Sequence, residues 1–389
     1  MPNARRQHQA LCYTIEGLNS FGTVLYFTYV YFLLHDKFGF DDKARLAVAA
    51  LLGLVYAFAA WQGGKFGQRH GNFTALKLGL GVMAAAFALA SQLGTAAGQV
   101  VGAVVVSLGM CFTWPVLEAL VSEGEEPGHV PHAVGLYNIT WAITNAAAIF
   151  TGGMLKDAFG YRVIFYLPLA IVMTQLALTS WLEKIKLPAA NKDSAPPPDA
   201  KRPPPARAKN FLRMAWLANP FAYVAINTLI AVLPGVAAKF HLSATLAGFT
   251  LSFWGFVRLA TFVALWRWDG WHYRFRWLVT AFALLSFSFA TILTATNLWV
   301  VLAAQAFFGA AIGLIYYSSL FYSMDASDTK SEHGGIHEAA IGLGNCLGPA
   351  VGALSLQFLP QAANAGASAV TGLLVVGFLG LFVIRKTAG

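Results

Sequence analysis

Residues 186–210 read KLPAANKDSAPPPDAKRPPPARAKN, a Pro-rich and basic stretch with almost nothing to bury. This composition is typical of a solvated linker rather than of a folded domain. Apolar runs recur on both sides of the stretch, and each is about twenty residues long, which is enough to cross the hydrocarbon of a bilayer. The stretch therefore divides a membrane-spanning chain into two halves.

The composition excludes a soluble protein. Of the 389 residues, 57% are hydrophobic and 11% are charged, and the mean hydropathy is +0.60. Soluble domains carry roughly a quarter charged residues, so this chain lacks the polar side chains that a water-facing surface needs. We predict an all-α integral membrane protein.

The apolar runs, bounded by Gly, Pro and charged residues, predict twelve transmembrane helices. Six precede the linker, near 11–34, 44–62, 74–93, 98–121, 132–154 and 162–182. Six follow it, near 212–236, 243–266, 277–296, 298–323, 334–357 and 366–384. The predicted organisation is an N-terminal six-helix bundle at 1–183, a cytoplasmic Pro-rich basic linker at 184–211 and a C-terminal six-helix bundle at 212–389.

The positions of the Lys and Arg residues predict the orientation in the membrane. With the amino terminus in the cytoplasm, the cytoplasmic segments hold 19 of the 26 Lys and Arg residues, the opposite side holds 6, and one, Arg258, lies within a span. Positive charge favours the cytoplasmic side, so we expect both termini in the cytoplasm and a multi-pass protein of the plasma (inner) membrane. This topology explains the net charge of +9, and no nucleic-acid partner is predicted.

An internal repeat supports the division into two related bundles. The helices predicted at 132–154 and 334–357 align at a constant offset of 200 positions. The matched pairs are Gly135 with Gly335, Asn138 with Glu338, Asn145 with Asn345, and Gly152 with Gly352. Such a repeat is typical of secondary transporters, whose two halves carry similar helices around a central site.

The segment GGKFGQRHGNF, between the second and third predicted helices, carries a resemblance to a known family. It is similar to the G-x-L-a-D-R-x-G-R-K loop of the major facilitator superfamily at Gly64, Arg69 and Gly71, with Gln68 at the acidic position. The resemblance implies two pseudo-symmetric six-helix bundles, joined by a cytoplasmic linker, with a solute site between them. It covers the whole chain.

The exit of the fifth predicted helix, NAAAIFTGGMLKDAFGYRVIFYLP, resembles the family's GG-x-L-x-D-x-x-G-W-R-x-x-F segment. The matching positions are Gly152, Gly153, Leu155, Asp157, Gly160 and Arg162. The resemblance to drug exporters favours export, and nutrient or metabolite uptake stays an open alternative. A G-x-x-x-G-P pattern stands in the eleventh predicted helix, at Gly344, Gly348 and Pro349, where it indicates a kink and close packing.

Ionisable side chains inside spans are candidates for proton coupling or gating, because each costs about 2.5 to 3.5 kcal/mol in the membrane. Arg258 lies about nine residues before the cytoplasmic end of its predicted helix. It is either a counter-ion for an anionic solute or carboxylate, or else it forms a structural ion pair or extends its charged end toward the cytoplasm. Glu16 shares a helical face with Tyr13 and Asn19, so we expect a polar cavity wall and a carboxyl that exchanges protons. A shallow, hydrated Glu16 is the alternative.

Two further carboxylates lie near the predicted cytoplasmic ends of their helices. Glu338 is placed either to stabilise a helix N-terminus or to form a gate with Arg69 or Arg258. Glu118 follows Trp114 and Pro115, and a partner in the loop after the second helix is expected for it.

The resemblance implies that uncharged polar and aromatic side chains form the wall of the solute site. The candidates lie on the first, fourth, fifth, seventh, tenth and eleventh predicted helices. They are Tyr26, Tyr29, Trp114, Tyr137, Asn138, Trp141, Asn145, Tyr223, Asn227, Tyr316, Tyr317 and Asn345.

The predicted function is secondary active transport of a small organic solute by alternating access, coupled to protons. No P-loop and no His/Asp/Ser constellation occurs, and the three cysteines have no metal-ligand spacing, so no enzyme activity, metal or cofactor is predicted. We expect a monomer in the lipid bilayer whose partners are the solute and H+. The altered position at Gln68 leaves a non-transporting sensor or assembly protein as the alternative.

Overall fold

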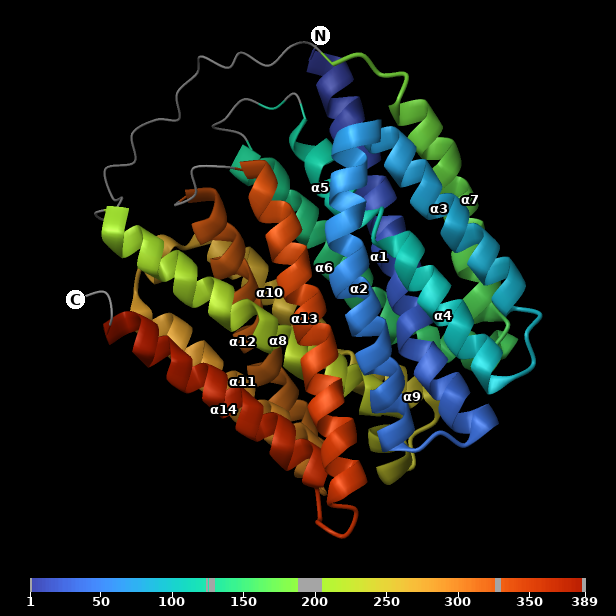
Figure 1. Cartoon of the computed structure of the whole chain (residues 1–389), viewed down its shortest axis with the longest axis vertical. Helices are drawn as coiled ribbons and strands as arrows, with labels where there is room; N and C mark the ends of the chain where they lie inside the picture. The colour runs from blue at the N-terminus through green and yellow to red at the C-terminus, as the bar shows by residue number, and fades with distance from the viewer. Residues whose placement is uncertain (1, 124, 126–129, 188–204, 326–329, 387–389) are drawn as a thin grey trace.

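The structure, a computed structural model, describes residues 2–123, 125, 130–187, 205–325 and 330–386 (Figure 1). Within these residues the regular elements are all helical. In the first half they are α1 (Pro2–Phe38), α2 (Asp42–His70), α3 (Asn72–Ala90), α4 (Ala96–Met110), α5 (Trp114–Ser122), α6 (Val130–Phe159) and α7 (Val163–Leu182). In the second half they are α8 (Pro205–Lys239), α9 (Ala244–Leu251), α10 (Phe253–Arg267), the 3-10 turn η1 (Asp269–Trp271), α11 (Phe275–Thr294), α12 (Leu298–Asp325), α13 (Lys330–Phe358) and α14 (Ala365–Lys386).

Twelve helical segments of the described chain are long and apolar enough to cross a membrane, as predicted. Two of them are broken where the sequence predicts a single helix. Near 98–121 the chain turns after α4 and restarts as α5, with Pro115 in the first turn, where its missing N–H costs nothing. Near 243–266 the break falls at Ser252, between α9 and α10.

A side chain from another helix explains the break between α9 and α10. The Gln305 amide of α12 accepts a hydrogen bond from the Trp254 N–H at 3.3 Å and donates one to the Thr250 carbonyl at 3.1 Å. These are the two groups that an unbroken α-helix would pair with each other. Gln305 therefore substitutes for the missing backbone hydrogen bond, and its buried amide is satisfied at the same time.

Most helices extend beyond the predicted apolar runs, because a run marks only the part that the hydrocarbon covers. The motif GGKFGQRHGNF is the clearest case: Gly64 and Arg69 lie within α2 and not in a loop. Only Gly71 turns, with φ +91, a backbone conformation that favours glycine. The centre of the predicted linker, 188–204, lies outside the described residues, and α8 begins with Pro205.

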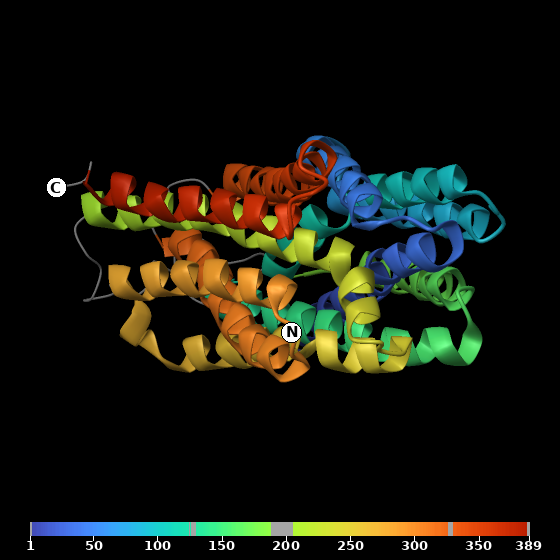
Figure 2. The same cartoon turned by 90° about the horizontal axis from the view of Figure 1, so that it is seen from below.

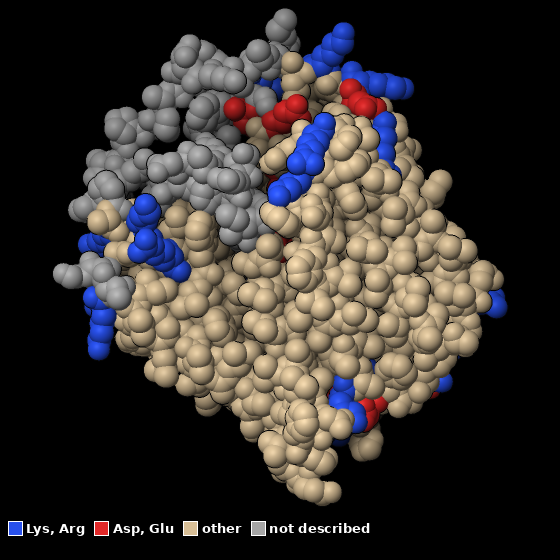
Figure 3. Space-filling model, in the orientation of Figure 1, with Lys and Arg blue, Asp and Glu red and all other residues tan. Residues whose placement is uncertain are grey.

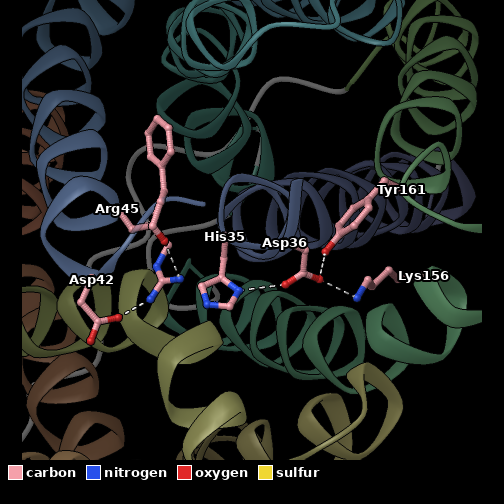
Figure 4. A network of polar contacts seen from close by, with 7 residues as sticks. His35, Asp36, Asp42, Arg45, Lys156 and Tyr161 are labelled. Atoms are coloured by element: carbon pink, nitrogen blue, oxygen red, sulfur yellow. Dashed lines mark hydrogen bonds and ion pairs between the residues drawn. The ribbon is translucent and has the colours of Figure 1, made fainter. Parts of the chain in front are cut away.

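The helices form two six-helix bundles, α1–α7 and α8–α14, which Figures 1 and 2 show from two directions. The beginnings of α1 and α8 lie far apart in Figure 1, whereas their ends lie close together. At this converging end the backbone of Gly235 in α8 packs on the Asp42 carboxylate. The buried Arg45 binds Asp42 and donates to the Phe40 carbonyl at 3.2 Å (Figure 4).

The ends of α1 and α6 are tied together at the same end of the molecule. Asp36 is bonded to His35 at 2.9 Å and accepts hydrogen bonds from Lys156 at 3.0 Å and from the Tyr161 hydroxyl (Figure 4). Burial and the neighbouring Asp36 carboxylate both raise the pKa of Tyr161, so its hydroxyl stays protonated and donates. This cluster holds the last turn of α6 in place.

From that braced turn, α6 reaches across to the second bundle. The Asp157 carboxylate accepts hydrogen bonds from the Thr245 N–H at 2.9 Å and the Thr245 hydroxyl at 2.7 Å, in the first turn of α9. One helical turn earlier, Gly153 lies directly against the backbone of Ala244. The exit segment that carries the family resemblance is therefore a contact between the bundles.

The second backbone contact between the bundles joins α2 to α13. A Cβ on Gly53 would lie 2.4 Å from the Asn345 carbonyl carbon, and one on Gly342 would lie 2.5 Å from Ala57 Cα. Small residues at helix contacts are typical of membrane bundles, where van der Waals packing replaces the hydrophobic effect. Gly344 and Gly348 of the predicted G-x-x-x-G-P pattern pack in the same way against α8.

The outer surface fits a bilayer. In Figure 3, Lys and Arg side chains of the described residues gather at the upper end and the upper left of this face, with a smaller group at the lower end. The wide band between them is almost free of charged side chains, and many large apolar side chains of the helices are exposed to the outside, Phe58, Phe287 and Val376 among them. The protein is a multi-pass membrane protein.

Candidate solute-binding site

A cavity of about 160 Å³ lies between the two bundles. Its wall is shared by α1, α2, α4, α5 and α6 of the first bundle and by α8, α10, α12 and α13 of the second. Most of the lining side chains are apolar or aromatic, and the charged ones are Glu118, Arg258 and Glu338. A concave, mostly apolar site with a few polar groups is the usual form of a small-molecule site.

The structure brings eight of the twelve predicted wall residues into this cavity. They are Trp114, Tyr137, Trp141, Asn145, Tyr223, Asn227, Tyr316 and Asn345. Asn145 and Asn345, which the internal repeat pairs at an offset of 200, both line the cavity from α6 and α13. The Asn227 amide donates to the Asn345 side-chain oxygen, so α8 and α13 are linked at the wall.

Two predicted tyrosines of α1 lie outside the cavity because they pack inside the first bundle. Tyr26 is fully buried, with edge contacts to the rings of Phe87 and Phe165 at 5.1 and 5.9 Å. The Tyr29 hydroxyl donates to the Ile149 carbonyl at 2.7 Å, and its ring lies where Gly152 leaves room. Both have structural partners in place of a solute.

Asn138 and Tyr317 also lie outside the cavity lining. Asn138 accepts a hydrogen bond from the Tyr316 hydroxyl at 3.1 Å and donates to the Val134 carbonyl at 2.8 Å. It therefore positions a cavity tyrosine across the bundle interface. Tyr317 packs on the rings of Phe262 and Trp271, at 5.7 and 5.8 Å.

The predicted polar stripe of α1, Tyr13, Glu16 and Asn19, faces neighbouring helices and not the cavity. The prediction that this stripe forms a cavity wall is therefore wrong. The fully buried Glu16 accepts hydrogen bonds from Ser20 at 2.6 Å, Tyr137 at 2.8 Å and the Trp114 indole at 3.2 Å. Asn19 donates to the Thr113 hydroxyl at 3.3 Å. Glu16 is thus not shallow, and it lies directly behind two aromatic side chains that do line the cavity.

Arg258 lines the cavity from α10 and is 1% exposed. As predicted, it lies nine residues before the end of its helix, Arg267. Its guanidinium carbon lies over the rings of Trp141 and Trp254, 4.3 and 5.1 Å from their centres. Among the described residues, neither bundle contributes an Asp or Glu within ion-pair distance of Arg258. The alternative prediction of a structural ion pair is therefore wrong.

Glu338 lines the cavity from α13 and accepts a hydrogen bond from the Tyr56 hydroxyl of α2 at 2.5 Å. The predicted gate with Arg69 or Arg258 is wrong for this conformation, because Tyr56 is the partner that the described chain offers. Since α13 begins at Lys330, Glu338 is also too far along the helix to stabilise its N-terminus.

Glu118 and Arg69 do not meet. Glu118 is half-buried on α5 and lines the cavity, whereas Arg69 is exposed in the last turn of α2 and does not. The predicted partner for Glu118 in the segment after the second helix is not found among the described residues.

Several cavity residues were not among the sequence candidates. They are the polar or aromatic side chains Thr23, Thr28, Tyr31, Tyr56, Ser107 and Trp254. On α1, Thr23 and Phe27 continue the face of Glu16 by two and three turns, and this face lines the cavity only from Thr23 onward. Tyr56, Ser107 and Trp254 lie in strongly apolar runs that gave no signal for the site.

Comparison with known proteins agrees with this geometry. The family profile of the Major Facilitator Superfamily matches residues 10–334. The chain belongs to the Major Facilitator Superfamily. A comparison with curated protein sequences gives no match.

Solved structures of superfamily transporters share the fold over nearly the whole chain. A peptide transporter, POT, in complex with alafosfalin has a TM-score of 0.74 at 15% identity, covering 98% of this chain and 94% of that one. The nucleoside transporter NupG gives 0.69 at 13% identity, with 96% and 99% covered. The human organic anion transporter MFSD10 (TETRAN) gives 0.67 at 15% identity, with 98% and 99% covered. At these identities the likeness concerns the fold alone.

Proposed function

We propose that this superfamily member is a secondary active transporter of a small organic solute, that it works by alternating access, and that protons drive it. The observation that carries the proposal is the cavity itself, because both bundles contribute to its wall. A site shared by two rigid bundles is exposed to one side of the membrane or the other as the bundles rock. The superfamily members of similar fold are described as transporters of peptides, nucleosides and organic anions.

The contacts between the bundles are of a kind that rocking can break and reform. At the converging end they are the two hydrogen bonds from Thr245 to Asp157 and the backbone packing of Gly153 on Ala244. Toward the opposite end, the His132 ring lies 5.7 Å from the Trp266 ring across the interface. No covalent or metal link has to be broken at any of these contacts.

Glu16 is our candidate for the proton carrier, because its protonation state is linked to the cavity wall. The ionised carboxylate is an acceptor only, and it receives donors from Trp114 and Tyr137. A protonated carboxyl carries a donor hydrogen of its own, so its three contacts with Ser20, Trp114 and Tyr137 do not all persist in the same form. The two side chains line the cavity, and a proton on Glu16 would change the surface that the solute meets. One solved relative is described as a proton dependent oligopeptide transporter.

We place both termini in the cytoplasm, which puts the converging end of the bundles on the outer side, and we expect a monomer because one chain carries both bundles. The direction of transport that we favour is export, from the resemblance of the segment at 152–162 to exporters. Uptake by proton symport is the other direction that the same cavity would support.

Proton movement in liposomes tests the proposal without a labelled solute. The purified protein is reconstituted in vesicles that contain a pH-sensitive dye, and sugars, organic acids, amino acids, nucleosides and lipophilic cations are added one class at a time. We expect one class to cause protein-dependent proton flux, inward or outward according to symport or antiport. Glu16→Gln should abolish this flux and retain solute exchange, because exchange needs no net proton movement.

Glu183→Gln is the matched control, since Glu183 is an exposed carboxylate that binds Lys77 at 2.5 Å, away from the cavity. It should leave the flux unchanged. Undiminished proton flux in Glu16→Gln would remove Glu16 from the mechanism. The absence of both flux and exchange with every class of solute would refute transport and favour the sensor or assembly alternative.

A further inference from the structure

The charge on Arg258 is buried and incompletely bonded. The side chain is 1% exposed, and its Nε and Nη2 atoms are buried with no hydrogen-bond partner in the part of the chain that the structure describes. A guanidinium carries five N–H donors, and a buried donor that lacks an acceptor is costly. The Trp141 and Trp254 rings stabilise the cation from its faces, but they accept no hydrogen bonds from the N–H groups at its edge.

Carboxylates in the same cavity do not supply the missing acceptor. Glu338 binds Tyr56, and Glu16, behind the wall, binds three donors of the first bundle. Glu118 lines the cavity without an ion pair to Arg258 among the described side chains. An uncompensated buried charge destabilises a fold, and the described side chains leave this cost unrelieved. A molecule that brings an acceptor into the cavity would relieve it.

We propose that Arg258 binds the carboxylate of a small organic solute, and that the apolar body of this solute lies among the cavity aromatics Trp141, Tyr223, Trp254 and Tyr316. This inference rests on the proposed function and names the substrate class of the same site. The planar guanidinium fork matches a carboxylate through two parallel hydrogen bonds, which a single ammonium group would not.

The other charged residues of the cavity limit the charge of the solute. Arg258 is the one cation among the described lining residues, and the remaining ionisable acids there are Glu118 and Glu338. A phosphate ester with two negative charges would meet one positive group and two acidic ones, whereas a monocarboxylate is matched by the single guanidinium. Both a simple carboxylic acid and an amino acid satisfy this requirement, because the recognised group is the carboxylate.

Ligand binding to the purified natural protein is the first test, with compounds that share one phenyl-containing frame. The set is 3-phenylpropionate, its neutral amide 3-phenylpropanamide, the zwitterion phenylalanine and the cation 2-phenylethylamine. Binding is followed by the fluorescence of the tryptophans and by thermal unfolding, up to about 10 mM, where even a millimolar site is mostly occupied. We expect the carboxylate or the zwitterion to bind, and the amide and the cation to bind about tenfold more weakly or not at all.

Variants then assign the effect to Arg258. Arg258→Gln should weaken carboxylate binding about tenfold or more, and Arg258→Lys should restore part of it, because the charge returns without the fork. Arg267→Gln is the control, since Arg267 is exposed on the same helix. If Arg258→Gln does not fold, the comparison of the four ligands on the natural protein still decides.

Three results would overturn the inference: equal binding of 3-phenylpropionate and its amide, preferred binding of 2-phenylethylamine, or no binding of either carboxylate. The outcome is separable from the proposed function. Solute-dependent proton flux with a neutral or cationic class alone would leave transport standing without the carboxylate site. Carboxylate binding that depends on Arg258, without flux or exchange, would leave the site standing without transport.

Discussion

Gly153→Ala adds a methyl group where α6 and α9 touch backbone to backbone. The new Cβ would lie 1.8 Å from the Ala244 carbonyl oxygen and 2.5 Å from the carbonyl carbon. Ordinary van der Waals contact begins at 3.4 Å, so the difference from 1.8 Å requires the two backbones to separate by about 1.6 Å. Because the obstructing atoms belong to the main chain, no change of side-chain rotamer relieves the overlap.

Overpacking of this kind costs about 1–3 kcal/mol, and here the cost falls only on the conformation in which the converging end is closed. The equilibrium should therefore shift about 5- to 150-fold toward a conformation that is open at that end. The assay is the labelling rate of Asn145→Cys, a cavity position, by an impermeant maleimide from the side opposite the termini, in a protein without the 3 native cysteines.

Gly135→Ala is the matched control, because Gly135 is on the same helix and a Cβ there meets nothing within 4 Å. It should leave the labelling rate near that of the natural sequence. If Gly153→Ala labels no faster than Gly135→Ala, the contact of α6 with α9 does not hold this end of the molecule closed, and the reasoning fails.

The remaining predictions concern the other contacts between the bundles. Asp157→Ala should remove about 0.5–2 kcal/mol from the closed conformation, and a double-mutant cycle with Thr245→Val in the same labelling assay should show that the two effects are not additive. Tyr56→Phe should leave Glu338 without its donor, and thermal unfolding should detect a loss of about 1.5–3 kcal/mol, as for a hydrogen bond to a charged group. Gly342→Ala should separate α2 from α13 and lower the unfolding temperature, whereas no change would mean that this pair of helices tolerates a wider spacing.

The membrane class and the number of spans follow from hydrophobicity, which is a local property of the chain. A run of about twenty apolar residues in a bilayer forms a helix, because a helix satisfies the backbone hydrogen-bonding groups of the segment within the segment itself. The two broken spans show the limit of this rule. Pro115 gives a local signal for the first break. The second depends on Gln305, which is 51 positions from Trp254 and 55 from Thr250 in the sequence and hydrogen-bonds both of their backbone groups.

Part of the candidate site could be predicted from the sequence for a similar reason. Buried polar and aromatic residues in apolar runs are costly, so their presence marks the bundle interior, and Arg258, Asn145 and Asn345 all line the cavity. Sequence alone does not distinguish the sides of a helix that is buried all round. Tyr26 and Tyr29 of α1 therefore looked like cavity residues, although their faces pack within their own bundle.

The sequence by itself determined that this chain is a twelve-span membrane protein in two halves, and which costly polar groups its interior contains. Only the tertiary structure decided how these groups are paired. Among the described residues, Tyr56 and not an arginine meets Glu338, Asp157 bonds across to the start of α9, and the Nε and Nη2 atoms of Arg258 have no acceptor. The physical reason is that hydrogen bonds and ion pairs act over a few ångströms, so partners distant in sequence become known only when the packing of the helices sets their separations.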